Sequence, residues 1–286
     1  MKPDYKLCFE KGGFEPYAHI QQENVECEVD SDDINLKSFR VKNHLEDNIW
    51  DGDELNLRVR DKLMEIADDF WESCNIKWVK PKTVILTGSI CNFNWSSFSD
   101  IDVHVVVDFS EIHERKDFVQ EYFDEKKNDW NNTHDNLNIF GYPVELYVED
   151  VDAETESNGI YDLWKNEWVK KPDDIESIGL NKYVIKDIAS RIMTRIDDMS
   201  DKFHSTEDSH ELEKLNEKIV SLRKHIKEMR KEGLKHGEMG MLNIVCKVIK
   251  RSGYMDKLRD LNHEIYDKIN SLNENKSFEA NIRKIF

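Results

Sequence analysis

Two aspartates separated by a single residue are the first feature of the sequence that could do chemistry. Asp100 and Asp102 begin the stretch Asp100–Val107, whose β-branched residues predict a strand. Alternate residues of a strand project from one face, so the two carboxylates should lie a few ångströms apart. Like charges so close repel unless a cation lies between them, and paired oxygen ligands suit Mg²⁺, which completes its coordination with waters and substrate phosphates.

A glycine and a serine lie upstream of this pair. The stretch Thr83–Thr87 predicts a buried strand, and Gly88 and Ser89 follow it directly. A glycine lets a phosphate approach the backbone, where N–H groups and the Ser89 hydroxyl can bind it. We therefore expect Gly88 and Ser89 to end the strand, open a short helix and hold phosphate.

The sequence pattern around these residues predicts an α+β domain with a small mixed sheet. Before the first strand we expect a helix capped by Asp51 or Asp53, because apolar residues recur at helical spacing: Leu55, Val59, Leu63, Ile66, Ala67 and Phe70. Further on we expect a helix over Glu111–Trp130, a hairpin joining Asn138–Phe140 to Val144–Val148, and a short hairpin within Ile160–Val169. Residues 1–50 are acidic and irregular, with alternation only at Val25–Val29.

The chain changes to a helical period after Pro172. Four helices are expected, marked by apolar residues from Ile185 to Phe203, Leu212 to Met229, Leu242 to Ile249 and Met255 to Leu272, with Gly233, Gly237 and Gly253 at the breaks. The predicted organisation is an acidic N-terminal segment (1–50), an α+β catalytic domain (51–175) and an all-α C-terminal bundle (176–286).

Composition narrows the function. The 286 residues carry a net charge of −18, of which residues 1–179 contribute −22 and residues 180–286 contribute +4. An acidic catalytic half disfavours non-specific nucleic-acid binding. No apolar run approaches the roughly 18–20 residues of a membrane span, and the five cysteines are widely spaced without a C-x-x-C pair. We expect a soluble cytoplasmic protein with no membrane partner and no disulfide framework.

The spacing of these residues resembles the signature of the DNA polymerase β-like nucleotidyltransferase superfamily. An apolar strand leads to Gly88-Ser89, ten residues intervene, and Asp100-Ile101-Asp102 follows. The family has a third acid on a later strand, which Glu145 in VELYV matches. The resemblance covers roughly residues 51–148. The segments SSFSDIDVHVVVDF and GYPVELYVED are also similar in sequence to uncharacterised nucleotidyltransferase-domain proteins of tailed bacteriophages.

The resemblance implies an activity and its cofactors. Asp100, Asp102 and Glu145 would hold two Mg²⁺ ions, which Mn²⁺ can replace. Gly88-Ser89 would grip the triphosphate of an NTP while an acceptor hydroxyl attacks the α-phosphorus and pyrophosphate leaves. The hydroxyl's proton would pass to Asp102 or Glu145. A helical domain that follows the catalytic domain often contacts the nucleotide or the acceptor in this family.

The third acid has alternatives in the sequence. Glu149, Asp150 and Asp135 could each replace Glu145. Only Glu145 stands in mid-strand between apolar residues, where a carboxylate without a cation would be hard to accommodate.

Other residues have both a functional and a structural interpretation. His104 shares the face of the aspartates and could line the pocket, although such a histidine is more often a satisfied packing residue. Trp95, Tyr142 and Tyr147 could stack on a base, although aromatics at such positions are usually core.

Two basic stretches in the C-terminal half have the same ambiguity. Lys247, Lys250 and Arg251 fall together on the third expected helix and could clamp a triphosphate or an RNA backbone, or be a solvated face. The run Arg230–His236 superficially matches an R-x-H motif of helical RNases, but its internal glycine indicates a helix end.

We therefore predict a Mg²⁺-dependent nucleotidyltransferase that moves NMP from an NTP, with ATP favoured, to a hydroxyl acceptor. The acceptor could be a small molecule, a nucleotide, an RNA end or a protein. The location would be the host cytoplasm if the gene is carried by a phage. The alternative is a non-catalytic, antitoxin-like interaction protein that keeps the fold and acts through its helical surface.

Overall fold

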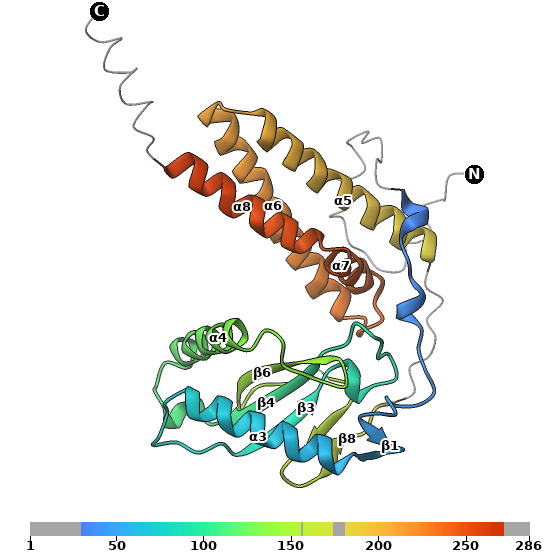
Figure 1. Cartoon of the computed structure of the whole chain (residues 1–286), viewed down its shortest axis with the longest axis vertical. Coiled ribbons are helices and arrows are strands. Elements are labelled where there is room, and N and C mark those ends of the chain that lie inside the picture. The colour runs from blue at the N-terminus through green and yellow to red at the C-terminus, as the bar shows by residue number, and fades with distance from the viewer. Residues whose placement is uncertain (1–29, 156, 174–180, 272–286) are drawn as a thin grey trace, which may run out of the picture. The chain divides into compact units, whose positions relative to one another are not determined.

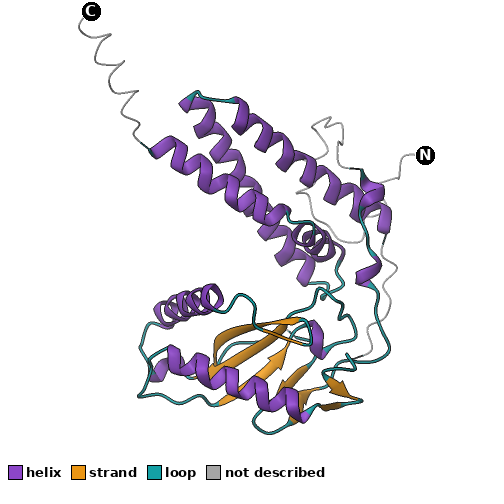
Figure 2. Ribbon diagram, viewed as in Figure 1, coloured by secondary structure: helices purple, strands orange, loops and turns teal. Residues whose placement is uncertain are grey.

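The computed structural model describes residues 30–155, 157–173 and 181–271. They divide into two compact units, one within Lys37–Ser177 and one combining residues up to Leu36 with those from Ile178 onward. Figures 1 and 2 show strands and helices in the first unit and helices in the second. The strand suggested at Val25–Val29 lies outside the described residues.

The first unit is built on a mixed sheet. Its six strands among the described residues pair in the order β5-β6-β4-β3-β7-β8. Figure 1 labels β6, β4, β3 and β8 of this sheet. Their bounds are Thr83–Thr87 (β3), Ile101–Val107 (β4), Asn138–Ile139 (β5), Tyr142–Asp150 (β6), Ile160–Asp162 (β7) and Glu167–Lys170 (β8). The β4–β6 pair is parallel and the other pairs are antiparallel. The predicted α+β class, both strands of the motif and both hairpins are thereby confirmed.

Alternation along β4 separates a core face from a polar face. Ile101, Val103, Val105 and Val107 are fully buried, whereas the residues between them are half-buried. The buried side packs in one hydrophobic core with residues of two helices, α3 (Leu57–Ser73) and α4 (Lys116–Thr133). The carboxylates therefore belong to the face of the sheet that these helices leave uncovered.

Two helix boundaries differ from the sequence prediction. Neither Asp51 nor Asp53 caps α3, because the chain first makes a short antiparallel pair of strands, β1 (Trp50–Asp51) and β2 (Glu54–Leu55). Asn56 is the cap, and its Oδ1 accepts the N–H of Arg58 at 3.0 Å. The second helix starts at Lys116 rather than at Glu111, because residues 109–111 form a separate 3₁₀ turn.

The core of this unit extends further toward the N-terminus than the expected boundary at residue 51. Leu45, Ile49 and Trp50 are buried in the same core as the sheet, and the Trp50 indole N–H donates to the carbonyl of Ile90 at 2.9 Å. The segment that follows Lys37 is thus part of the α+β unit.

The second unit is a helical bundle, as predicted. Its helices are α5 (Lys182–Ser205), α6 (Ser209–Leu234), α7 (Met241–Arg251) and α8 (Tyr254–Asn270). The expected apolar stripes of α5, α6 and α7 are buried, and so are Leu258, Leu261 and Ile265 of α8. Met255 and Ile269 are half-buried, and Leu272 lies outside the described residues. Helix α5 also contacts the short 3₁₀ helix Ser31–Asp33. No helix within the described part of the chain has the length and apolar character needed to cross a bilayer.

Helix α3 allows a matched test of the core. Leu63 is fully buried, and Leu63→Ala should lower the free energy of unfolding by about 2–5 kcal/mol because it leaves a cavity. Leu57 on the same helix is 63% exposed, so Leu57→Ala should change that free energy by less than about 0.5 kcal/mol. Urea unfolding followed by tryptophan fluorescence measures both, since all 7 tryptophans of the chain lie in this unit. Equal losses in the two variants would contradict this packing.

Candidate active site

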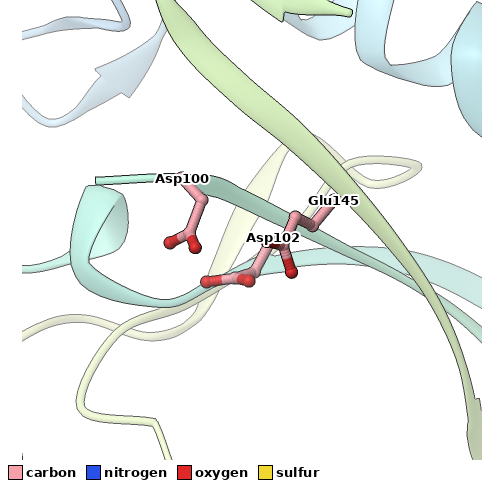
Figure 3. A group of neighbouring side chains, drawn as sticks. All are labelled: Asp100, Asp102 and Glu145. Atoms are coloured by element: carbon pink, nitrogen blue, oxygen red, sulfur yellow. The ribbon is translucent and has the colours of Figure 1, made fainter. Parts of the chain in front are cut away.

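Three carboxylates gather on the polar face of the sheet. Asp100, Asp102 and Glu145 each offer an oxygen, and these oxygens lie within 4.8 Å of one another (Figure 3). Asp100 immediately precedes β4, and Asp102 pairs in parallel register with Glu145 on β6. All three are half-buried. The arrangement is a set of hard oxygen donors of the type that Mg²⁺ or Mn²⁺ takes.

The Gly88-Ser89 turn lies directly against this cluster. Thr87 at the end of β3 pairs with Asp102, and Gly88 then takes φ +77°, a conformation that favours glycine. A Cβ at position 88 would lie 2.0 Å from Oδ2 of Asp102. The 3₁₀ helix Ser89–Cys91 follows, so the predicted strand end and short helix are both present.

Side chains of the intervening loop fix the turn. Nδ2 of the fully buried Asn92 donates to the Gly88 carbonyl at 2.7 Å. The Ser89 and Ser99 hydroxyl oxygens are 2.7 Å apart, and Oγ of Ser99 accepts the Ser96 N–H at 3.0 Å. Asn92 and Ser99 have no assigned role in the sequence analysis. Their only signal was the polar character of a loop between two strands.

The close approach of Gly88 to Asp102 makes position 88 a test of the cluster. Gly88→Ala should displace the Asp102 carboxylate, because the new methyl group would occupy its place and the backbone is strained for a side chain. We expect Mn²⁺ affinity, measured by calorimetry, to fall at least about tenfold. Gly141 also has positive φ but has open space around it, so Gly141→Ala should strain the backbone and leave Mn²⁺ affinity unchanged. Wild-type affinity in Gly88→Ala would rule out this packing.

Tyr147 and Lys127 surround the carboxylate of Glu145. The Tyr147 hydroxyl donates to Oε2 of Glu145 at 2.5 Å, and Nζ of Lys127 on α4 lies 3.6 Å from the same oxygen. Lys127 also lies over the Tyr147 ring, 3.5 Å from its centroid. Burial, followed by the charges of Asp102 and Glu145, raises the pKa of Tyr147 far above its usual range, so the phenol remains a donor. From the sequence, Tyr147 was expected either to stack on a base or to lie in the core, and Lys127 was not singled out.

His104 is held by several partners. Its Nδ1 lies 2.6 Å from Oε2 of Glu149, its Nε2 lies 3.3 Å from Oγ1 of Thr87, and its ring stacks on Tyr147 at 4.7 Å. A carboxylate only accepts, so Nδ1 carries the hydrogen and Nε2 can accept from the threonine. This is the packing role that the sequence analysis gave as the more frequent one.

The alternative third acids are engaged elsewhere. Glu149 accepts from His104 and, at 2.6 Å, from Thr155. Asp150 pairs with Lys116 at 2.7 Å and accepts the Phe109 N–H. Asp135 is exposed beside Asn136. Among the described residues Glu145 is the acid that completes a cluster with Asp100 and Asp102.

The remaining aromatic candidates have structural contacts. The Trp95 indole N–H donates to the His44 carbonyl at 2.9 Å, and Lys42 lies over its ring at 3.9 Å. Tyr142 is buried in the core of the α+β unit. Both fit the usual core interpretation.

The basic candidates belong to the helical unit. Lys247, Lys250 and Arg251 lie on α7, where Nζ of Lys247 is 3.7 Å from Oε2 of Glu238 and Lys250 is exposed. Their assignment to a triphosphate or acceptor stays a prediction. The run Arg230–His236 spans the end of α6 at Leu234. This agrees with the helix end that its internal glycine predicted.

The hydrogen bonds of Glu149 predict a pH dependence of stability. Burial alone would raise the pKa of Glu149, but the hydrogen bonds from His104 and Thr155 outweigh it and lower the pKa below its ordinary 4.5. A depressed pKa gives stability that is present above pH 4.5 and lost as the pH falls through the folded-state pKa.

Glu149→Gln should therefore cost roughly 1–3 kcal/mol of unfolding free energy at pH 7, and the difference from wild type should close below pH 4.5. Urea unfolding monitored by tryptophan fluorescence at pH 7 and pH 3 measures it. A difference that stays constant between those pH values would mean that the charge of Glu149 is not what these hydrogen bonds stabilise.

Comparisons with known proteins give little beyond this geometry. No protein-family model matches the sequence, and no curated protein sequence matches it. The chain has a weak likeness to a solved structure titled "Structure of STING-associated CdnE c-di-GMP synthase from Capnocytophaga granulosa", with 9% identity over 75% of this chain and 84% of that chain. The TM-score is 0.22, which is too low to establish a shared fold.

Proposed function

We propose that the protein is a Mg²⁺-dependent nucleotidyltransferase that moves NMP from an NTP to a hydroxyl acceptor and releases pyrophosphate. One observation carries the proposal. Carboxylates from two adjacent parallel strands converge to within 4.8 Å, directly beside the glycine of the Gly88-Ser89 turn. The resemblance to the polymerase β-like superfamily is supported by this convergence, because the sequence places Glu145 more than forty residues after the aspartates.

The residues of the cluster fit a divalent cation. Asp102 is packed against the Cα of Gly88, where a side chain on residue 88 would overlap it, and Glu145 is fixed by the Tyr147 hydroxyl. Three carboxylates without a cation repel one another, and a donor set made only of carboxylate oxygens suits Mg²⁺ or Mn²⁺. In this proposal Asp100, Asp102 and Glu145 hold two ions. When bound, such ions neutralise phosphate charge and make the acceptor hydroxyl more acidic.

The chain's own groups position the reactants and take up a proton. In this proposal the Gly88-Ser89 turn binds the triphosphate through its backbone N–H groups and the Ser89 hydroxyl. The acceptor oxygen forms its bond to the α-phosphorus as the bond from that phosphorus to the β-phosphate oxygen breaks. In this proposal the hydroxyl's proton passes to Asp102 or Glu145.

The helical unit and the acceptor complete the proposal. Lys247, Lys250 and Arg251 would contact the triphosphate or the acceptor from the C-terminal domain. ATP is the favoured nucleotide, and the acidity of the α+β half disfavours a long nucleic acid as acceptor. A small molecule, a nucleotide, an RNA end and a protein side chain remain the acceptors to test.

Replacing a proposed metal ligand tests the activity. Wild type, incubated with each labelled NTP, Mg²⁺ and a cell extract as the source of acceptor, should release labelled product and pyrophosphate. Asp102→Asn keeps the shape of the side chain and removes its charge, so transfer should fall roughly 100-fold or more. Circular dichroism should show that the variant remains folded, since it relieves repulsion among the carboxylates.

A matched control uses an aspartate outside the site. Asp61 on α3 pairs with Arg60 and is 74% exposed, so Asp61→Asn should keep wild-type transfer. Absence of any product from wild type with all four NTPs, together with absence of Mn²⁺ binding, would contradict the proposal. The antitoxin-like interaction protein would then be the better description.

A further inference from the structure

A lysine from a helix reaches the carboxylate cluster. Lys127 lies on α4, one helical turn beyond Phe123, which is buried in the core on the opposite side of the sheet from the acids. Its ammonium nevertheless lies 3.6 Å from Oε2 of Glu145 and over the ring of Tyr147. Its side chain is only 22% exposed. An exposed lysine usually keeps its charged group in water, so this placement indicates a specific electrostatic partner.

The partner is the negative charge of the cluster. Asp100, Asp102 and Glu145 hold three like charges within 4.8 Å, and a nearby ammonium offsets part of their repulsion. A divalent cation bound to the same carboxylates would bring two more positive charges close to Lys127. Lys127 and the cation therefore compete for the carboxylate of Glu145.

Tyr147 acts on the same oxygen in the opposite sense. Its hydroxyl donates to Oε2 of Glu145 at 2.5 Å without adding charge. Its ring stacks on His104 of the neighbouring strand and is also in contact with Lys127 on α4. A neutral donor held in this way orients a ligating carboxylate and does not repel a cation.

We propose that Lys127 and Tyr147 are positioning residues that set the metal affinity of Glu145 in opposite directions. Lys127 is the counter-ion of the metal-free cluster and competes with the cation, whereas Tyr147 holds Glu145 in the orientation that binds it. The inference rests on the proposed function, because it requires that the cluster binds a divalent cation.

Calorimetric titration of the purified full chain with Mn²⁺ alone tests the pair without any turnover. Lys127→Met removes the charge at similar length and should tighten Mn²⁺ binding by roughly three- to tenfold. Lys127→Arg keeps the charge and should stay close to wild type. Tyr147→Phe keeps the ring and removes the donor, so it should weaken binding by roughly 10- to 100-fold.

Two neighbours provide matched controls. Lys126 is adjacent on α4 and lies near the Tyr122 ring, and the Tyr122 hydroxyl donates to the Cys74 carbonyl rather than to an acid. Lys126→Met and Tyr122→Phe should leave Mn²⁺ affinity unchanged, even where they change the urea midpoint of unfolding.

The outcomes separate the two proposals. If wild type binds no Mn²⁺, the metal site itself fails and the inference fails with it. If wild type binds Mn²⁺ but Lys127→Met binds it equally or more weakly, the competition is wrong and Lys127 is a structural contact. If Tyr147→Phe binds as wild type does, the hydroxyl does not position Glu145. Opposite shifts in the two variants, both folded by circular dichroism, support the assignment.

Discussion

The parallel pairing of β4 with β6 is the constraint on which the candidate site depends. It sets Asp102 opposite Glu145, and a shift of one residue along either strand would turn that strand's acids toward the core. The four fully buried aliphatic residues of β4 fix the register, because each would be exposed by such a shift. Parallel neighbours also require a crossover connection, and α4 provides it. The helix that closes the core thus also brings Lys127 to the edge of the acid cluster.

The pairing of β4 with β6 brings three negatively charged carboxylates together on a half-buried face, which is electrostatically unfavourable. The three carboxylates, whose oxygens lie within 4.8 Å of one another, repel, and the groups that contact them come from different parts of the chain. Lys127 on the crossover helix offsets part of the charge of Glu145, Tyr147 on β6 donates a hydrogen bond to it, and Gly88 at the end of β3 packs against Asp102. Of these three groups Lys127 alone brings a positive charge, and a single ammonium carries half the charge of a divalent cation.

Patterns local in the sequence predicted most of the fold. Apolar residues at helical spacing located the four helices of the bundle, because that period is set by which face is buried. The β-branched content of β3 and β4 and the turn residues between β5 and β6 located the strands. The aspartates were found for the same reason, since alternate residues of one strand share a face whatever its neighbours are. Glu145 was identified by the resemblance to a family with a third acid on a later strand. It was preferred over the nearby acids because it stands in the middle of an apolar strand.

The features that the sequence did not predict depend on contacts between distant segments. Leu45, Ile49 and Trp50 join the core through a loop and a two-residue strand, which have no period to detect. Aspartate is a residue type that often caps helices, so Asp51 and Asp53 were reasonable candidates. The β1–β2 pair occupies this part of the chain, however, and α3 begins only after it, with Asn56 as its cap. Lys127 is one of many lysines on helix faces, and only the pairing of β4 with β6 decides that it meets Glu145.

Tyr147 connects the acid cluster to the rest of the polar face. Its hydroxyl bonds Glu145 and its ring stacks on His104, which in turn bonds Glu149 on β6 and Thr87 on β3. The carboxylate of Glu145 is therefore tied through two side chains to the central three strands of the sheet. A ligand held by such a network loses little conformational freedom when it binds a cation, because its orientation is already set. The neighbouring part of this face is accordingly built from half-buried polar side chains, of which His104 and Glu149 are hydrogen-bonded to each other.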